Sequence, residues 1–284
     1  FTPPLETSGR AGFNFTVTDS AGDTWTQQCC LLISTQSQPR PVSWIGDGSA
    51  NLWDTTTANF SSLLGPTAFE TGDAVTIDDN GSNSPTIKVN SALSPASLTV
   101  SNSSKNFTIE GSGTLAATGR FSKSGSGSLT ISNSGPNTFS SATLDGGTVT
   151  LTTANGLGTG PITFSTATLG FSADLPNPLV FNGTGVLNPS GTRNLTGSWT
   201  GSGTVQINNA GSSLITLQGN TSAFSGNVNF ANSSGSARLY GSTGSANAAF
   251  DLGSNNLRFY NRNGGSSFQL GSLTGGLKIG RAHV

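Results

Sequence analysis

Apolar and polar residues alternate along most of the chain, in short runs separated by turns rich in glycine. A period of two is typical of β-strands that bury one face, because successive side chains point to opposite sides of a strand. The clearest runs are residues 97–100, 128–131, 148–151, 204–207, 227–230 and 256–259. We therefore expect an all-β chain in which Leu, Val, Ile and Phe point inward while Thr, Ser and Asn point outward.

The apolar positions also repeat at a longer interval. Leu129, Val149 and Leu169 follow one another at twenty-residue steps, and a second apolar position repeats with them two residues later. A fixed interval of this length is the signature of a solenoid, in which each coil stacks on the one before. We predict that these three residues lie in register on one inner face of parallel strands. A Val149→Asp change would then bury an unpaired charge and destabilise the fold severely.

The first 35 residues follow a different pattern. Residues 12–19 and 24–33 are predicted to form two strands joined by a polar turn, and this resembles the last hairpin of a bacterial immunoglobulin-like domain. We expect residues 1–35 to be the C-terminal fragment of an Ig-like β-sandwich. Two prolines then mark a linker over residues 36–43. An array of Ig-like repeats without a solenoid is the alternative if this hairpin represents the whole chain.

Three motifs follow one another in the middle of the chain, and a leader precedes them. The motifs are Lys123-Ser124-Gly125-Ser126-Gly127-Ser128-Leu129-Thr130-Ile131, Asn137-Thr138-Phe139-Ser140 and Gly147-Thr148-Val149-Thr150-Leu151, and the leader contains Trp44-Ile45-Gly46-Asp47-Gly48 and Asn51-Leu52-Trp53-Asp54. Over residues 44–160 the chain resembles the autotransporter-associated β-strand repeat family of bacteria. A degenerate second copy begins at Gly201 and lacks the lysine.

This resemblance implies a right-handed parallel β-helix (solenoid) in a secreted passenger or a cell-surface stalk. On this basis we expect residues 44–96 to form the leader, or cap, of the β-helix and residues 97–278 to form the repeat solenoid. The expected location is extracellular or at the outer-membrane surface. Missing N- and C-terminal domains of the same chain are expected partners.

The end of the chain departs from the strand rhythm after Leu277. Residues 279–284 resemble the in-frame translation of a sequencing-library adapter, so we expect them to be an artefact rather than part of the fold. They include His283, the only histidine of the sequence. Without His283, histidine-based acid–base catalysis, Ser-His-Asp triads and histidine ligation of metals have no residue to use.

Charged residues are sparse and nearly balanced. The chain contains Lys+Arg 12 and Asp+Glu 13, for a formal net charge of -1. Because phosphate binding needs clustered cations, we expect no nucleic-acid partner. The longest apolar runs, such as residues 29–33, are far shorter than the ~20 residues of a membrane helix, so we expect no direct membrane span. Surface glycans and host or matrix molecules stay open as partners.

Asp73, Asp78, Asp79 and Asn80 form the densest cluster of side-chain oxygens in the sequence. Such oxygens are the ligands that Ca²⁺ prefers, so these four residues are a candidate calcium site. The favoured alternative is a β-turn, because Asp-Asp-Asn-Gly is a strong turn sequence. A third interpretation is the carboxylate pair of a β-helical glycosidase. Adjacent strand residues point to opposite faces, so Asp78 and Asp79 would cooperate only if a turn brought them together.

Trp44, Trp53 and Phe60 are a candidate sugar platform, since aromatic faces suit carbohydrate rings. The favoured alternative is that they cap the open end of the solenoid core. Taken together, these observations predict a non-enzymatic extracellular segment that projects or displays other domains and adheres through its polar ridges. The alternative is a carbohydrate-binding or carbohydrate-active β-helix.

Overall fold

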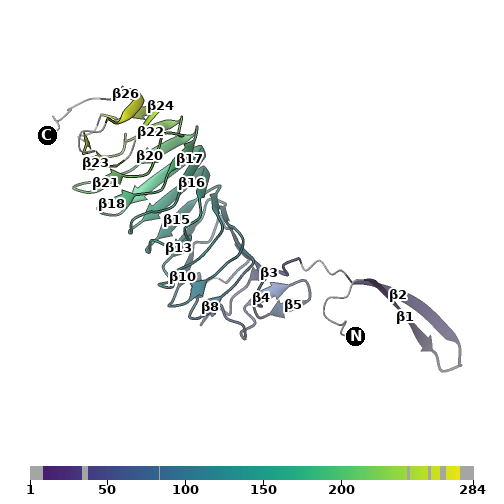
Figure 1. Cartoon of the computed structure of the whole chain (residues 1–284). Coiled ribbons are helices and arrows are strands. Elements are labelled where there is room, and N and C mark those ends of the chain that lie inside the picture. The colour runs from purple at the N-terminus through teal and green to yellow at the C-terminus, as the bar shows by residue number, and fades with distance from the viewer. Residues whose placement is uncertain are drawn as a thin grey trace. The chain divides into compact units, whose positions relative to one another are not determined.

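A computed structural model describes residues 9–33, 38–82, 84–241, 244–254, 257–262 and 267–275. Within these ranges the chain consists of β-strands, turns and loops, with no helix. The chain divides into two units, Phe1–Pro39 and Arg40–Val284 (Figure 1). The six residues from Ile279 to Val284, which we expect to be foreign, lie outside the described ranges.

The first unit contains one antiparallel hairpin. Strand β1 (Gly9–Thr18) pairs with β2 (Thr24–Ile33) along its whole length. Asp19 closes the turn, because its carboxylate accepts the backbone N–H groups of Ala21 and Asp23 at 2.9 Å each. The hairpin expected from the sequence is therefore present.

The second unit is a parallel β-solenoid of about nine turns with three faces. The first face contains β3 (Pro41–Trp44), β6 (Ala74–Asp78), β9 (Ser97–Ser101), β12 (Phe121–Ser124), β14 (Ala142–Leu144), the first halves of β16 (Ile162–Phe171) and β17 (Leu179–Pro189), and β19 (Trp199–Gly201). The second face contains β7 (Thr86–Lys88), β10 (Phe107–Glu110), β13 (Ser128–Ile131), β15 (Thr148–Leu151), the later halves of β16 and β17, β20 (Thr204–Ile207), β22 (Asn227–Asn229), and the ends of β24 (Gly244–Asp251) and β26 (Gln269–Thr274). The third face contains β8 (Ala92–Leu93), β11 (Thr114–Leu115), β18 (Arg193–Leu195), β21 (Leu214–Leu217), β23 (Ser236–Leu239) and β25 (Arg258–Asn261).

The predicted inner row is confirmed. Leu129 pairs with Val149 and Val149 pairs with Leu169, in parallel strands of the second face. The row continues through Leu187 to Ile207, and all five side chains are buried. The twenty-residue interval therefore measures one turn of the solenoid.

The solenoid begins earlier than the sequence indicated. Strand β3 already pairs in parallel with β6, and β6 pairs with β9. The residues from Pro41 that we expected in the linker are therefore the first strand, and the leader is itself coiled. A short antiparallel hairpin of β4 (Phe60–Ser62) and β5 (Gly65–Thr67) pairs with β3 on its other edge.

Glycine makes room for aromatic packing at one inner position. Gly185 lies between Ala167 and Val205 in a row of the second face. The rings of Phe164 and Phe181 stack beside it, with centroids 5.0 Å apart and planes at 12°. A Cβ atom at Gly185 would lie 2.7 Å from the Phe181 ring. Only glycine leaves this space open.

Buried asparagines join the turns of successive coils. Asn137 accepts the backbone N–H of Leu115 at 3.0 Å through Oδ1 and donates to the carbonyl oxygen of Gly156 at 2.9 Å through Nδ2. It also exchanges hydrogen bonds with the buried amide of Asn133. One amide thus links three coils, which gives a physical reason for the asparagine of the Asn-Thr-Phe-Ser motif.

Candidate functional site

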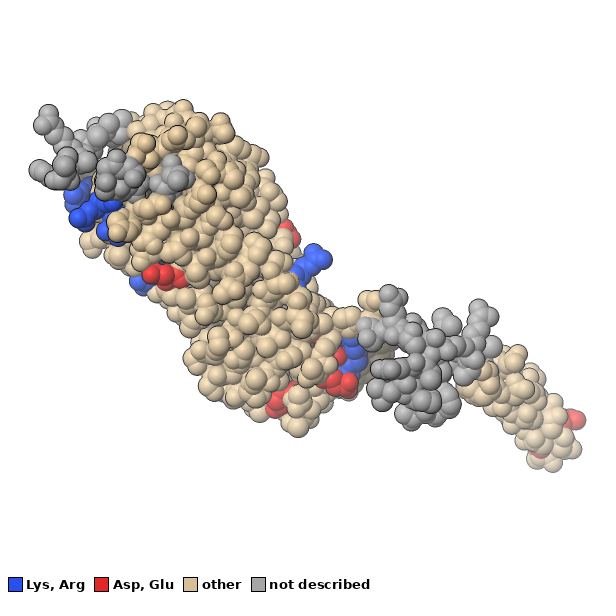
Figure 2. All heavy atoms as spheres, viewed as in Figure 1, with Lys and Arg blue, Asp and Glu red and all other residues tan. Residues whose placement is uncertain are grey.

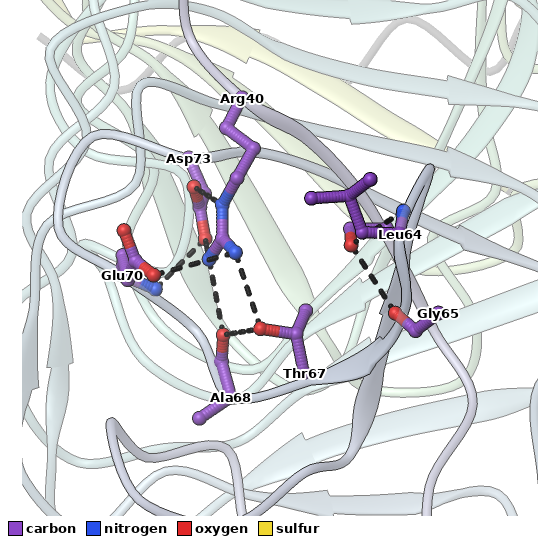
Figure 3. A network of polar contacts seen from close by, with 8 residues as sticks. Arg40, Leu64, Gly65, Thr67, Ala68, Glu70 and Asp73 are labelled. Carbon is purple, nitrogen blue, oxygen red and sulfur yellow. Dashed lines mark hydrogen bonds and ion pairs between the residues drawn. The ribbon is translucent and has the colours of Figure 1, made fainter. Parts of the chain in front are cut away.

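Asp73 lies at the start of the solenoid in an ion pair with Arg40 (Figure 3). The pair is bidentate, with Arg40 Nε donating to Oδ1 at 2.9 Å and Nη2 donating to Oδ2 at 2.7 Å. Arg40 also donates to Thr67 Oγ1 at 3.1 Å, and these contacts tie β3, β5 and β6 together. The hydrogen bonds with Asp73 raise the pKa of Arg40. The Asp73 carboxylate therefore forms a structural ion pair with Arg40.

Asp78 and Asn80 form a local turn at the other end of β6. The Asp78 carboxylate accepts the backbone N–H of Asn80 at 2.9 Å and its side-chain amide at 3.2 Å. This is the hydrogen-bonded turn that the Asp-Asp-Asn-Gly sequence favours.

Asp79 points to the next coil instead. Its carboxylate accepts the backbone N–H groups of Ser103, Ser104 and Lys105 at 2.9 to 3.2 Å. The bonds from Lys105 and then Ser103 are the main reason that the pKa of Asp79 falls to about 2, because they favour the ionised form. Asp79 therefore remains an anion that anchors one turn to the next.

The structure does not bring the four candidate calcium ligands together. Asp73 and Asp78 flank opposite ends of β6, and Asp79 is held by backbone donors of another coil. Across the described ranges, no group of three or more His, Cys, Asp or Glu side chains is placed to hold a metal ion.

The candidate sugar platform requires a correction. Trp44, Trp53 and Phe60 are buried, with exposed fractions of 0 to 1%. Phe60 packs edge-on against both tryptophans, at centroid distances of 5.1 and 5.6 Å, and Phe69 joins the cluster. No aromatic face of these three residues is open to a sugar ring. They form apolar core beside the first strand, next to the β4–β5 hairpin.

Lys123 of the first motif points into the solenoid and is completely buried. It occupies an inner position between Val100 and Leu144 on the first face. Its ammonium donates to the carbonyl oxygens of Ser124 at 2.7 Å and Gly125 at 3.1 Å. Burial lowers the pKa of Lys123 to about 8, and the negative charge of Asp79 partly opposes this change.

The third face carries a surface that the sequence analysis missed. Outward positions of β23, β25 and the residue that follows each strand are occupied by Arg238, Tyr240, Arg258, Tyr260 and Arg262, which we name the Arg–Tyr face. Lys and Arg side chains gather on the side of the solenoid where β21 and β23 lie, toward its C-terminal end (Figure 2).

The signal for this surface was present in the period-two pattern. Leu257 and Phe259 face the core, so the residues between and after them must face outward. Most outward positions elsewhere carry Thr, Ser or Asn, with isolated exceptions such as Lys88, Glu110 and Gln206, whereas here neighbouring positions carry Arg and Tyr. The sequence analysis considered the inward residues alone and therefore did not identify the Arg and Tyr residues at the outward positions.

The described residues include no helix long and apolar enough to cross a membrane. No protein-family model matches the chain, and searches of curated proteins and of solved structures find no match.

Proposed function

We propose that the chain is a non-enzymatic structural segment of a secreted or cell-surface bacterial protein, where it projects or displays other domains. The observation that carries the proposal is the unbroken inner row that passes from Leu129 through successive coils to Ile207. In such a fold each coil contacts only its neighbours, so length can be added one coil at a time. This property suits a spacer that holds other domains away from a surface.

The proposal includes the family and the hand of the solenoid. A right-handed winding is expected because parallel strands connected within one sheet cross over in the right-handed sense in nearly all proteins. The asparagine of the Asn-Thr-Phe-Ser motif supports membership of the autotransporter-associated repeat family, since Asn137 bonds to the coils on both sides.

The N-terminal hairpin is proposed to be the end of an Ig-like domain. Phe13, Phe15, Val17 and Trp25 lie on one face of the hairpin and are 41 to 58% exposed. A two-stranded hairpin is only marginally stable alone. An apolar face of this size supports packing against further strands of a sandwich.

Absence of catalysis is part of the proposal. The two carboxylates considered for a glycosidase point to different partners, Asp78 to its own turn and Asp79 to the next coil. Such anchored groups are poorly suited to exchange protons with a substrate. We expect no turnover of plant or bacterial polysaccharides, with or without calcium. Turnover that disappears in Asp78→Asn or Asp79→Asn would contradict this.

The alternative function, a carbohydrate-binding solenoid, no longer rests on Trp44, Trp53 and Phe60. The Arg–Tyr face is the observation that favours it, because it offers exposed Tyr beside Arg. Binding and display are compatible, so this alternative extends the main proposal.

The location is tested by labelling cells. Antibodies against residues 40–278 should label intact cells of the source organism, and protease treatment of intact cells should remove the signal. A cytoplasmic protein serves as the control, since it should be labelled only after permeabilisation. If the chain also needs permeabilisation, the proposed function is wrong.

A further inference from the structure

The Arg–Tyr face alternates cationic and aromatic side chains in two directions. Along β25 and the residue after it, the outward order is Arg258, Tyr260 and Arg262. Across the strands, Arg238 stands directly opposite Tyr260. Arg262 extends the ladder by donating its backbone N–H to Leu239, which places it opposite Tyr240. Each arginine therefore has a tyrosine as a neighbour.

The spacing of this arrangement is set by the sheet. Adjacent strands lie about 4.8 Å apart, and alternate residues along one strand lie roughly 6.7 Å apart. The five side chains thus form a flat grid in which Arg258 and Arg262 are separated by roughly 13 Å. A grid of this kind matches an extended ligand that carries charges at regular intervals.

Two of the three arginines, Arg238 and Arg258, contact a neighbouring tyrosine ring. The guanidinium of Arg238 lies 5.6 Å from the ring centroid of Tyr240, and that of Arg258 lies 5.9 Å from the ring of Tyr260. Arg238 also donates to Thr216 Oγ1 at 3.0 Å. Contacts that hold a side chain before binding reduce the entropy lost when a ligand is bound.

The three guanidinium groups have no acidic partner within the described part of the chain, where the ion pairs belong to Arg40. The distribution of charge along the sequence strengthens this point. Residues 175–278 contain five Lys and Arg but a single acidic residue, Asp251. Asp174, which precedes this range, lies in the same outward row as Arg238 but three coils earlier, where its carboxylate accepts hydrogen bonds from Asn194. Asp251 lies at the end of β24 on the second face, where it accepts the backbone N–H of Gly253. The positive charge of the Arg–Tyr face is therefore not neutralised locally.

The aromatic part of this surface is also exceptional. The sequence contains two tyrosines, and both lie on these two neighbouring strands. Tyr240 is 51% exposed. A tyrosine offers an apolar ring face together with a polar hydroxyl, so it suits a ligand that has both kinds of surface.

We propose that the Arg–Tyr face binds an acidic polysaccharide, with the arginines pairing with carboxylate or sulfate groups and the tyrosines packing against sugar rings. An arginine fork matches a carboxylate in a bidentate geometry. The ligand must be extended, because the grid is flat and lies on the face of a sheet. The inference rests on the proposed function and deepens its carbohydrate-binding alternative, since it names the ligand class of an exposed segment.

The observations favour a polysaccharide over other anions. Strong nucleic-acid binding uses roughly six to ten phosphate contacts, and this face offers three arginines. An extended peptide usually binds at an unpaired strand edge, whereas the Arg–Tyr face is the side-chain surface of paired strands. Packing of rings against tyrosine adds a contribution that charge alone does not supply.

The test uses the full chain and measures retardation in native gels that contain polygalacturonate. Methyl-esterified polygalacturonate is the matched neutral polymer, dextran sulfate replaces carboxylate with sulfate, and single-stranded DNA tests for a nucleic-acid site. The variants are Arg258→Ser/Arg262→Ser, which removes two exposed charges, and Tyr240→Ser, which removes an aromatic face without changing charge. The control variant is Lys88→Ser/Arg120→Ser, which removes two exposed charges elsewhere on the solenoid.

We expect retardation by an acidic polymer and none by the methyl ester. The apparent Kd should rise about ten-fold in Arg258→Ser/Arg262→Ser and several-fold in Tyr240→Ser, and it should stay unchanged in the control. Absence of retardation by both acidic polymers, an equal loss in the control, or tighter binding of DNA would overturn the proposal. These outcomes are independent of surface labelling, so failure of this inference and failure of the proposed function can be told apart.

Discussion

Replacing Lys123 with methionine should stabilise the protein at neutral pH. The lysine is buried at an inner position where neighbouring coils place Val100 and Leu144, and burial lowers its pKa from 10.5 to about 8. At about 1.4 kcal/mol per pKa unit, this corresponds to about 3 kcal/mol against the charged form. Relaxation of the protein around the buried ammonium offsets part of this cost, which leaves about 2 kcal/mol.

The substitution also removes favourable contacts. The ammonium of Lys123 donates to the carbonyl oxygens of Ser124 and Gly125, and the carbonyl oxygen of Ser124 keeps a second donor, the backbone N–H of Asn102. Loss of the bond to Gly125 should cost about 1 kcal/mol. Methionine fills a similar volume with an apolar, flexible side chain. The net expectation at pH 7 is an increase in the free energy of unfolding of about 1 kcal/mol.

The sign of the pH dependence follows from the same pKa. Between pH 8 and 10.5 the unfolded chain holds a proton on Lys123 that the folded chain has released, so the stability of the wild type rises with pH in this range. Lys123→Met lacks this titration. Its advantage should therefore be present below pH 8 and should disappear as the pH approaches 10.

The assay is urea unfolding at pH 6 to 10, followed by the fluorescence of the buried tryptophans. Lys88→Met, at an exposed position, controls for the change in net charge. If Lys123→Met is less stable than the wild type at pH 7, or if the difference between them does not change with pH, the reasoning about the buried ammonium is refuted.

Three further predictions concern the hydrogen bonds between coils and the packing of the core. Asn137→Leu should lower the free energy of unfolding by about 2 to 4 kcal/mol in urea titrations, because it leaves buried backbone groups of Leu115 and Gly156 unpaired, whereas Asn90→Leu at an exposed position should have little effect. Asp79→Asn should reduce the loss of stability between pH 4 and 2 in acid titrations followed by circular dichroism. The wild-type carboxylate, with its pKa of about 2, stabilises the fold above this range and loses this effect as it is protonated. An unchanged acid transition would contradict the anchoring role. Gly185→Ala should lower the free energy of unfolding by about 1 to 3 kcal/mol, because the new Cβ meets the Phe181 ring. The control Gly170→Ala should lower it less, since the closest contact of its Cβ is a side-chain oxygen at 3.3 Å. Equal thermal midpoints of the two variants would contradict the packing around Gly185.

The sequence predicted the inner rows because burial leaves a strong periodic signal. Leu129, Val149 and Leu169 are apolar at equal intervals, and parallel stacking with equal coil lengths requires that interval. The start of the solenoid was less visible. Pro41 suggested a break in the chain, but a proline is tolerated at the first position of a strand, and β3 begins there.

The candidate sites were harder to predict because local sequence does not determine distant partners. Asp73 pairs with Arg40, which is 33 positions away in the sequence, and Asp79 bonds to residues of the next coil. The tryptophans at positions 44 and 53 were identified as a cap or a platform, and their burial was decided by packing with Phe60 and Phe69. The Arg–Tyr face depends on the alignment of two strands, which becomes clear only when coil lengths are known.

The parallel register of successive coils is the central claim, and one disulfide experiment tests it directly. Thr130 of β13 and Thr150 of β15 are directly opposed and half-buried at outward positions, so cysteines placed there should have Cα atoms about 5 Å apart. In a background with Cys29→Ser and Cys30→Ser, oxidation of Thr130→Cys/Thr150→Cys should give a nearly complete intramolecular disulfide, detected by mass spectrometry. Thr130→Cys/Thr148→Cys, shifted by two residues, should not form the bond. Efficient bonding of the shifted pair, or failure of the aligned pair, would contradict the solenoid register.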